Sequence, residues 1–229
     1  MADTFSFDLL NHSVTELGGQ PLINLTLSPM EGPASVAKRL EDLVLGGLLL
    51  LLASPLMLAI ALGVKLSSPG PVLFRQKRVG WSGRVFVVYK FRTMKLHHEA
   101  PGILTQAQAD DPRVTPLGRI LRRMSLDELP QLLNVFKGDM SLVGPRPHAL
   151  EHHEQYVSLV PTYAKRHLVK PGLTGWAQIH GCRGETETPE KMARRVAFDV
   201  EYIKRWGVGL DVAIIVRTIP ALLKRTNAY

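Results

Sequence analysis

The sequence contains a single cysteine, Cys182, so no disulfide can form within the chain. This fits a reducing compartment or the cytosolic face of a membrane. The common nucleotide-binding fingerprints G-x-x-x-x-G-K-[ST] and G-x-G-x-x-G are both absent, as is the H-E-x-x-H motif of zinc proteases. Internal repeats and low-complexity segments are absent too. These absences argue against a disulfide-bonded domain, a P-loop or dinucleotide-binding fold and an H-E-x-x-H zinc enzyme.

Acidic residues are scarce relative to basic ones. The 229 residues include 28 Lys and Arg but only 20 Asp and Glu, for a net charge of +8. Such an excess indicates an anionic partner: nucleic acid, an anionic lipid surface or a phosphorylated substrate. From Lys65 to Lys95 there are eight basic residues and no acidic one, directly after the most apolar part of the chain. That position favours a membrane surface over nucleic acid.

The apolar part, residues 43–64, carries no charge. As a straight helix rising about 1.5 Å per residue it would measure roughly 33 Å, enough to cross a bilayer core of about 30 Å. It begins too late to be an ordinary signal peptide. Ser54 and Pro55 lie at its middle, where the proline predicts a kink. Each half is too short to cross a bilayer alone.

Basic residues flank this run on both sides, with Lys38 and Arg39 before it and Lys65 after it. The positive-inside rule therefore places both ends in the cytosol. A helix that enters one leaflet, bends and leaves again satisfies this condition. A kinked spanning helix is the alternative, and these features leave both open.

A second apolar stretch, residues 210–223, is interrupted by Asp211 and Arg217 and is too short to span. It can lie in the membrane interface with its basic residues toward the headgroups, or form a core helix. Before it, the strand-like runs 72–79 and 84–91 flank the loop sequence GWSG and predict a β-hairpin. Residues 98–113 read as a loop, and 170–181 as a glycine-rich loop with a short strand. Helical periodicity covers four ranges: 117–123, 128–136, 148–159 and 190–206. The fold class is therefore α/β, a small mixed domain with short strands.

Two adjacent carboxylates, Asp127 and Glu128, stand in the stretch RRMSLDELPQLLNVFKGDMSLVGPRP. A structural interpretation is available, because Ser125 and Glu128 match the S-x-x-E capping box. Pro130 fits this poorly and suits the first helical position better, with both acids in the preceding turn.

A functional interpretation is also available for the two acids. Basic residues lie on both sides of them: Arg119, Arg122, Arg123 and Arg146. Carboxylates, Mg²⁺ and arginines together can hold a diphosphate. One carboxylate can then attack phosphorus while its neighbour holds the metal.

Two other groups of residues are less informative. His148, His152 and His153 include a pair four residues apart, but no further zinc ligand is apparent, so we interpret them as a solvated helix face. Aromatic residues around Lys90 and Arg92 could form a nucleic-acid patch. The preceding apolar segment makes that interpretation the weaker one, and we expect no nucleic-acid partner.

Several motifs together resemble one family over residues 37–229: KLSSPGPVLFRQKRVG, YKFRTMK, DPRVTPLG, the stretch around the two acids, KPGLTGWAQIHGCRGETET and FDVEYIKRW. The family is that of the bacterial sugar transferases, also called monotopic phosphoglycosyl transferases. Within it, HGCRGETET and the final TNAY resemble the subgroup of undecaprenyl-phosphate glucose phosphotransferases.

This resemblance implies transfer of a sugar 1-phosphate from a UDP-sugar to undecaprenyl phosphate, with release of UMP, as the first step of exopolysaccharide synthesis. The implied sugar is glucose, with galactose or an N-acetylated sugar as alternatives. The family's acidic pair falls on Asp127, the implied nucleophile of a covalent phosphosugar intermediate, and on Glu128, the implied Mg²⁺ ligand. Family substrate-binding positions fall on the following residues: Lys90, Arg92, Arg122, Arg146 and Asp199.

The resemblance also implies an organisation in three parts. Residues 1–35 are a leader or the remnant of a preceding domain, 36–66 a re-entrant membrane helix broken at Ser54 and Pro55, and 67–229 a catalytic domain ending in an interfacial helix. The catalytic domain is expected at the cytoplasmic face of the bacterial inner membrane, bound to membrane lipid. Homo-oligomerisation is left open. The glucose-specific relatives carry four further transmembrane helices and an extra domain, so we expect either a naturally short form or a fragment.

Two rival functions remain at this point. A membrane-bound scaffold would use its basic face on anionic lipid, and it requires the capping-box interpretation of Ser125 and Glu128. A Mg²⁺-dependent pyrophosphatase acting on nucleotide sugars would use water instead of a lipid phosphate as the acceptor.

Overall fold

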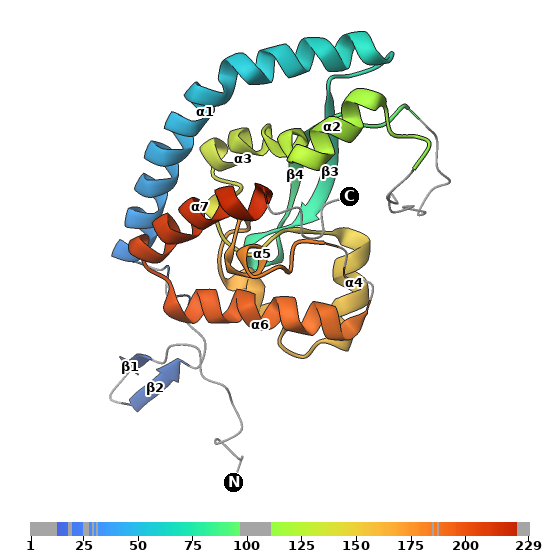
Figure 1. Ribbon diagram of the computed structural model, residues 1–229. Coiled ribbons are helices and arrows are strands. Elements are labelled where there is room, and N and C mark those ends of the chain that lie inside the picture. Colours follow the sequence, from blue (N-terminus) through green and yellow to red (C-terminus); the bar gives the residue numbers. More distant parts are fainter. Residues whose placement is uncertain are drawn as a thin grey trace.

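The computed structural model of the protein describes residues 13–17, 20–24, 28, 30, 32–96, 111–184, 186 and 188–223 (Figure 1). Most of the predicted loop 98–113 and much of the predicted leader 1–35 lie outside these residues. Within the leader, β1 (Ser13–Leu17) and β2 (Gln20–Asn24) pair antiparallel.

The apolar run forms a single helix, α1 (Pro33–Ser67), of 35 residues. Pro33 suits the start of a helix because the first turn needs no N–H from that residue. Pro55 lies inside, and the hydroxyl of Ser54 donates to the carbonyl of Leu51 at 2.8 Å. The helix stays continuous through Pro55, yet Figure 1 shows it changing direction between its lower and upper halves. Among the described helices, α1 is the one long and apolar enough to cross a membrane.

The predicted hairpin is confirmed as β3 (Leu73–Val79) and β4 (Val85–Phe91), joined by the short helix η2 (Trp81–Gly83). A two-residue strand, β6 (His148–Ala149), extends this sheet along the other edge of β3. A separate parallel pair joins β5 (Ser141–Val143) and β7 (Gly172–Thr174). The strand predicted within 170–181 is therefore confirmed as β7.

Helices make up most of the remaining described chain, so the predicted mixture of helix and short strands is confirmed. They are α2 (Pro116–Met124), η3 (Leu126–Glu128), α3 (Gln131–Lys137), α4 (Leu150–Leu159), η4 (Tyr163–Leu168), α5 (Trp176–Ile179), α6 (Pro189–Arg205) and α7 (Val208–Leu223). The helix predicted over 148–159 starts two residues later, because His148 and Ala149 pair with β3. His148 is only 5% exposed, so the solvated face expected for it is wrong.

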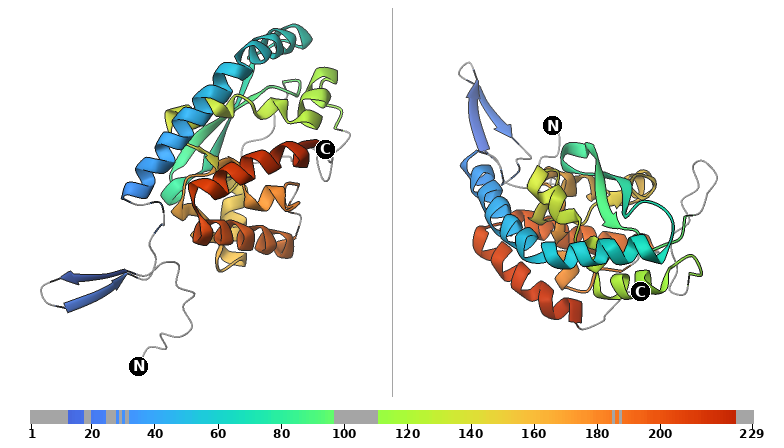
Figure 2. Two further views of the ribbon diagram at one scale, coloured as in Figure 1. Left: turned by 60° about the vertical axis from the view of Figure 1, so that its left-hand side comes forward. Right: turned by 90° about the horizontal axis from the view of Figure 1, so that it is seen from above.

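The main core lies where α3, β5, α6 and α7 meet. It includes Val135, Met140, Ile203 and Ile214, all fully buried. A second cluster packs Ile60 of α1 against Phe91 and Leu121. The second half of α1 and helix α6 lie at opposite ends of the molecule, as Figures 1 and 2 show.

The first turns of α1 are bound to the rest of the described chain by buried charges. Lys38 Nζ lies 2.5 Å from Asp211 Oδ2 on α7 and 3.2 Å from Asp42 Oδ1. The same Asp42 oxygen accepts hydrogen bonds from Ser141 Oγ and from the backbone N–H of Leu142. The side chain of Lys38 is only 7% exposed, so this residue forms a buried ion pair in addition to flanking the apolar segment.

The last turn of α1 is bound to the same domain. Arg92, which follows β4, donates from Nη2 to the carbonyl of Ser68 at 2.6 Å and to that of Val64 at 3.3 Å. Arg92 is 5% exposed. Carbonyls at a helix C-terminus lack intrahelical partners, and a guanidinium satisfies them well. Both ends of α1 therefore attach to one globular body.

Helix α7 confirms the core-helix alternative for residues 210–223 on one of its faces, while the interfacial alternative stays a prediction. One face packs into the core through Ile214 and through Asp211, whose carboxylate accepts from Tyr202 Oη at 2.8 Å. The opposite face leaves Val212, Val216 and Ile219 exposed.

Candidate active site

The two adjacent acids lie in the short helix η3, between α2 and α3. Ser125, just before them, has φ 57°, a left-handed conformation that is uncommon for a residue other than glycine. Its side chain caps no backbone N–H, and Glu128 points elsewhere, so the predicted capping box is wrong. Pro130 stands immediately before the first residue of α3, so both acids do precede that helix, as its sequence indicated.

Glu128 is held by two cations. Its Oε1 lies 2.8 Å from Lys90 Nζ and 2.5 Å from Arg146 Nη2, while Oε2 accepts from Arg146 Nη1 at 3.1 Å. Burial alone would raise the pKa of Glu128, but Arg146 and Lys90 lower it well below its usual value. Lys90, which is 38 positions from Glu128, thus meets Glu128 and Arg146 in one charge cluster, and Glu128 stays ionised.

The carboxylate of Asp127, unlike that of Glu128, is not bound by a described cation. Its residue is 8% exposed, and among the described residues no side chain or backbone N–H donates to its carboxylate. Burial, followed by the charge of Glu128, raises the pKa of Asp127 to about 6, against the opposing effects of Lys90 and Arg122. Adjacent carboxylates with pKa values driven apart are typical of sites where each acid has a separate chemical role.

Arg122 is positioned next to Asp127 by the packing of α2. Its Nε donates to Thr93 Oγ1 at 2.9 Å. The helix approaches Thr93 closely at Gly118, where an added Cβ would lie 2.0 Å from the carbonyl oxygen of Thr93. Only glycine permits this approach. The structure thus brings Lys90, Arg122 and Arg146 around the two acids.

Arg92 and Asp199 lie outside this cluster. Arg92 binds the end of α1, as described above. Asp199 is buried against Arg166, with 2.9 Å between Oδ2 and Nη2, and Arg166 in turn donates to the carbonyl of Arg146 at 2.7 Å. Asp199 thus lies behind Arg146, and Arg92 lies beside α1. Substrate-binding roles for both residues stay predictions.

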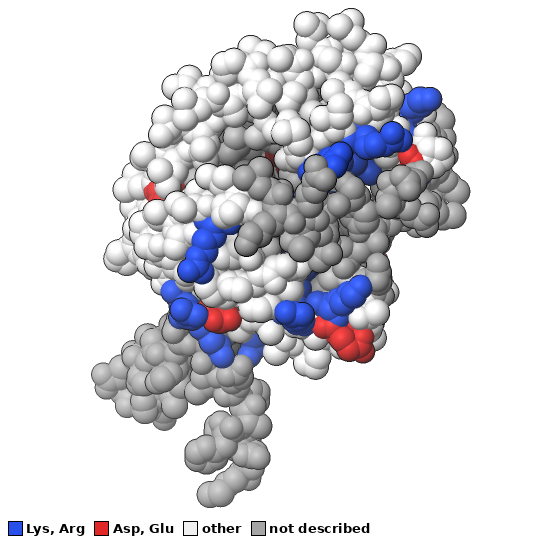
Figure 3. Space-filling model, in the orientation of Figure 1, with Lys and Arg blue, Asp and Glu red and all other residues white. Residues whose placement is uncertain are grey.

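Arg183 is a charged residue of the site that the analysis of the sequence did not single out. It lies in the segment between α5 and α6 and donates to Ser125 Oγ. The motif HGCRGETET contains it, but its position beside the acids depends on how this segment folds back onto η3. Basic side chains also gather on the surface over α2 and over α6 (Figure 3).

The described residues contain no group of three or more potential metal ligands from His, Cys, Asp and Glu. Mg²⁺ commonly binds one or two carboxylates and takes its remaining ligands from water and substrate phosphates. Asp127 offers a carboxylate without a hydrogen-bond donor, and Glu128 Oε2 accepts a single hydrogen bond. The two acids therefore fit a Mg²⁺ ion that is shared with a phosphorylated substrate.

Comparison with known proteins agrees with this geometry. The bacterial sugar transferase family matches residues 33–225. The UDP-glucose:undecaprenyl-phosphate glucose-1-phosphate transferase of Escherichia coli K12 is 54% identical over 217 residues, covering 95% of this chain and 47% of that protein. The protein of the same name from Xanthomonas campestris is 49% identical over 229 residues, covering 99% of this chain and 47% of its own length.

A third protein of that name, from Caulobacter vibrioides, is 51% identical over 210 residues, covering 90% of this chain and 78% of its own length. The chain spans about half the length of the first two relatives. The family match covers most of the chain, including η3 and the residues around it. The chain belongs to the bacterial sugar transferase family.

Proposed function

We propose that this chain transfers glucose 1-phosphate from UDP-glucose to undecaprenyl phosphate, giving undecaprenyl-diphospho-glucose and UMP. The observation that carries this proposal is the buried pair of acids within a cluster of basic side chains: Glu128 is held by cations, and Asp127 accepts no hydrogen bond from the described residues. The names of three relatives at about 50% identity support the two substrates. Both substrates carry phosphate, which agrees with the net charge of +8.

The proposed reaction has two displacements at one phosphorus atom. A carboxylate oxygen of Asp127 bonds to the phosphorus that carries the sugar, and the bond from that phosphorus to the oxygen of UMP breaks. UMP leaves with the bonding electrons. An oxygen of the lipid phosphate then attacks the same phosphorus and displaces Asp127, which regenerates the carboxylate.

The environments of the two acids explain why Asp127 is the nucleophile. The lone pairs of Glu128 point at Lys90 and Arg146, which lowers their availability for attack. None of the described side chains donates to Asp127 in this way, and its pKa of about 6 leaves it ionised yet more basic than an exposed aspartate. Lys90, Arg122 and Arg146 stabilise the charge on the phosphate oxygens during transfer.

Mg²⁺ would be held by Glu128, beside Asp127, and when bound it would polarise the phosphoryl oxygens. Glu128→Gln removes one ligand charge, so the Mg²⁺ concentration for half-maximal UMP release should rise at least about tenfold. The matched control is Glu154→Gln, because Glu154 is exposed on α4. An unchanged Mg²⁺ dependence in Glu128→Gln would remove Glu128 from the metal site.

The pH dependence of the first displacement follows from the raised pKa of Asp127. Only the ionised carboxylate attacks, so kcat/KM for UDP-glucose should be constant above about pH 6 and fall about tenfold per pH unit below it. Glu128 adds no second step in this range because its pKa is lowered. The check is a profile from pH 4.5 to 8.5 with UMP release as the readout. A profile that stays flat down to pH 4.5 would contradict this assignment.

We infer that α1 is re-entrant, entering and leaving the cytoplasmic leaflet of the inner membrane. The support is that Lys38 and Arg92 bind opposite ends of α1 to one globular body. A spanning helix would place those ends on opposite sides of a bilayer core about 30 Å thick, where one globular body could not bind both. Exposed leucines along the helix provide the apolar surface, including Leu51, Leu52 and Leu58. The exposed side of α7 would lie in the interface beside it.

Cysteine accessibility in inside-out and right-side-out vesicles tests this topology. Cys182 is first replaced by alanine, and single cysteines are then placed at exposed Val36 and Leu66, near the two ends of α1. A re-entrant helix predicts that an impermeant reagent labels both sites only from the cytoplasmic side. Labelling of the two sites from opposite sides would establish a span.

The function itself is tested by UMP release from UDP-glucose with and without undecaprenyl phosphate. Continuous release that needs the lipid phosphate supports the transferase. Release that continues without it would instead indicate a pyrophosphatase, with water as the acceptor. Lipid binding that is unaffected by Asp127 and Glu128 substitutions, without UMP release from a panel of UDP-sugars, would indicate a scaffold.

A further inference from the structure

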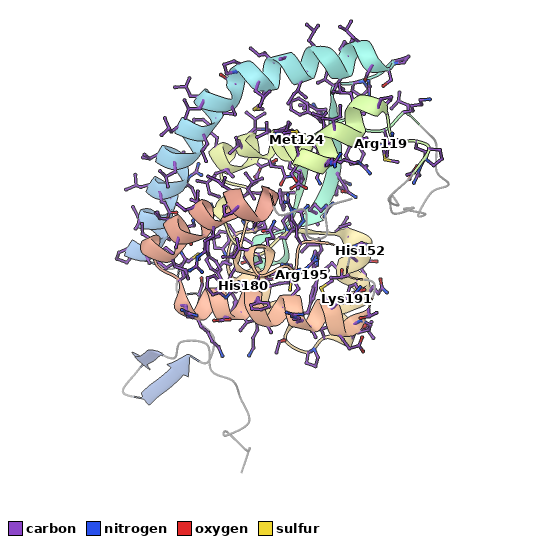
Figure 4. The ribbon with its side chains drawn as sticks, viewed as in Figure 1. Arg119, Met124, His152, His180, Lys191 and Arg195 are labelled. Carbon is purple, nitrogen blue, oxygen red and sulfur yellow. The ribbon has the colours of Figure 1, made fainter. Side chains whose placement is uncertain are left out.

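The segment between α5 and α6 is fixed at several points. The N–H of Cys182 donates to the carbonyl of Ala177 at 2.9 Å, and Tyr156 Oη donates to the carbonyl of Thr186 at 2.7 Å. Arg195, labelled in Figure 4, projects from α6 into the domain and donates to the carbonyl of Gly184. These bonds surround Arg183, so its direction is set by the fold.

Arg183 reaches the residue that begins the acidic turn. Its Nη2 donates to Ser125 Oγ, two positions before Asp127. Among the described residues this is its one hydrogen bond, so the guanidinium keeps further N–H groups for a ligand. Burial lowers the pKa of Arg183, and the charges of Glu128 and Asp127 oppose that shift, so the guanidinium interacts with the acidic pair.

The charges of the site do not balance among the described residues. Two carboxylates, Asp127 and Glu128, lie among four cations: Lys90, Arg122, Arg146 and Arg183. Asp111 also acts on Arg122, but its carboxylate is paired with Arg113. Burying unbalanced charge is unfavourable, and the one hydrogen bond that Arg183 makes within the described part of the chain is to a neutral hydroxyl. An excess of two positive charges matches the two ionised phosphates of a nucleotide diphosphate sugar. A guanidinium binds such oxygens with two parallel hydrogen bonds.

Two phosphorylated ligands could supply those oxygens, and the fold favours the nucleotide sugar. Arg183 belongs to the segment that leads into α6, whereas the second half of α1 lies at the opposite end of the molecule from α6 (Figures 1 and 2). A lipid acceptor would enter from the side of α1. We propose that Arg183 is a further substrate-binding residue, which exchanges its bond to Ser125 for the diphosphate of the nucleotide-sugar donor. This inference rests on the proposed function.

The test compares Arg183→Gln with a matched control, Arg194→Gln. Arg194 is an exposed residue of α6 whose guanidinium lies 6.0 Å from the ring centre of Phe198. In a two-displacement reaction, kcat/KM for each substrate reports its own half-reaction. Arg183→Gln should lower kcat/KM for UDP-glucose at least about tenfold and leave that for undecaprenyl phosphate within about twofold. Arg194→Gln should change neither value.

Equal losses of kcat/KM for both substrates, or an unchanged kcat/KM for UDP-glucose, would overturn the inference. If Arg183→Gln does not fold, Arg183→Lys is used instead. It should show the same selective loss, because lysine cannot form two parallel hydrogen bonds to a phosphate.

Calorimetric binding of UDP-glucose without acceptor separates this inference from the proposed function. If the wild type binds but does not turn over, only the function fails, and at least tenfold weaker binding by Arg183→Gln still supports Arg183. Equal affinity would refute the role of Arg183 while leaving the transferase in place.

Discussion

Asp127→Asn is expected to abolish sugar-phosphate transfer, lowering kcat by at least about a thousandfold. The amide that replaces the carboxylate cannot form the bond to phosphorus on which both displacements depend. The shape of the side chain is nearly unchanged, so UDP-glucose should still bind. Initial rates of UMP release, together with calorimetric binding of UDP-glucose, measure the two effects separately.

The same substitution should stabilise the fold. An ordinary aspartate has a pKa near 3.9 in the unfolded chain, whereas the pKa of buried Asp127 is about 6. Stability from a raised carboxyl pKa is present below about pH 4 and is lost as the pH rises to about 6. The loss amounts to about 2 to 3 kcal/mol at neutral pH, which a neutral amide avoids. The melting temperature of Asp127→Asn should therefore exceed that of the wild type by more at pH 8 than at pH 4.5.

The control for this pair of effects is Asp139→Asn, because Asp139 is exposed just after α3. It should leave both the rate and the melting temperature near those of the wild type. Substantial residual turnover by Asp127→Asn would contradict the nucleophile assignment. A variant that is both inactive and less stable would show that Asp127 has a structural role instead.

Lys38→Met is expected to destabilise the protein by about 3 to 5 kcal/mol, because it leaves a buried acidic cluster without its cation. Lys38 Nζ lies within 3.5 Å of three carboxylates, those of Glu41, Asp42 and Asp211. Removing one partner of a buried pair costs more than the pair contributes, since the remaining charges stay buried. The midpoint of unfolding in urea, measured in detergent micelles, reports the change.

Lys77→Met is the matched control, since Lys77 is exposed on β3. It should shift the free energy of unfolding by less than about 0.5 kcal/mol. A double-mutant cycle of Lys38→Met with Asp211→Asn should give a coupling of about 1 to 3 kcal/mol. Equal effects of Lys38→Met and Lys77→Met would show that the start of α1 is not bound to α7 through this lysine.

Local patterns in the sequence predicted much of this structure. The hairpin of β3 and β4 followed from two strand-like runs around a glycine-containing loop, and α6 from its helical periodicity. The acids at 127 and 128 were recognised from their neighbours in the same stretch, because Arg122 and Arg146 lie within 20 residues of them. Such features depend on residues close together in the chain.

Other features depend on contacts between distant residues. Lys38 and Asp211 are 173 positions apart, so sequence patterns assigned Lys38 to the flank of the membrane segment and Asp211 only to a second apolar stretch. The capping box failed for the same reason, because Lys90 and Arg146 draw the Glu128 side chain away from the N–H it would otherwise bind. The place of Arg183 in the site could not be predicted from local sequence patterns, because it depends on a segment that α6 holds in position.

The covalent intermediate is tested most directly by mass analysis of the protein after incubation with UDP-glucose and Mg²⁺ in the absence of lipid acceptor. We expect one added glucosyl phosphate group per chain, located on the peptide that contains Asp127. The group should be absent from Asp127→Asn and lost when undecaprenyl phosphate is added. UMP release by the wild type without any adduct, or an adduct that persists in Asp127→Asn, would contradict this intermediate.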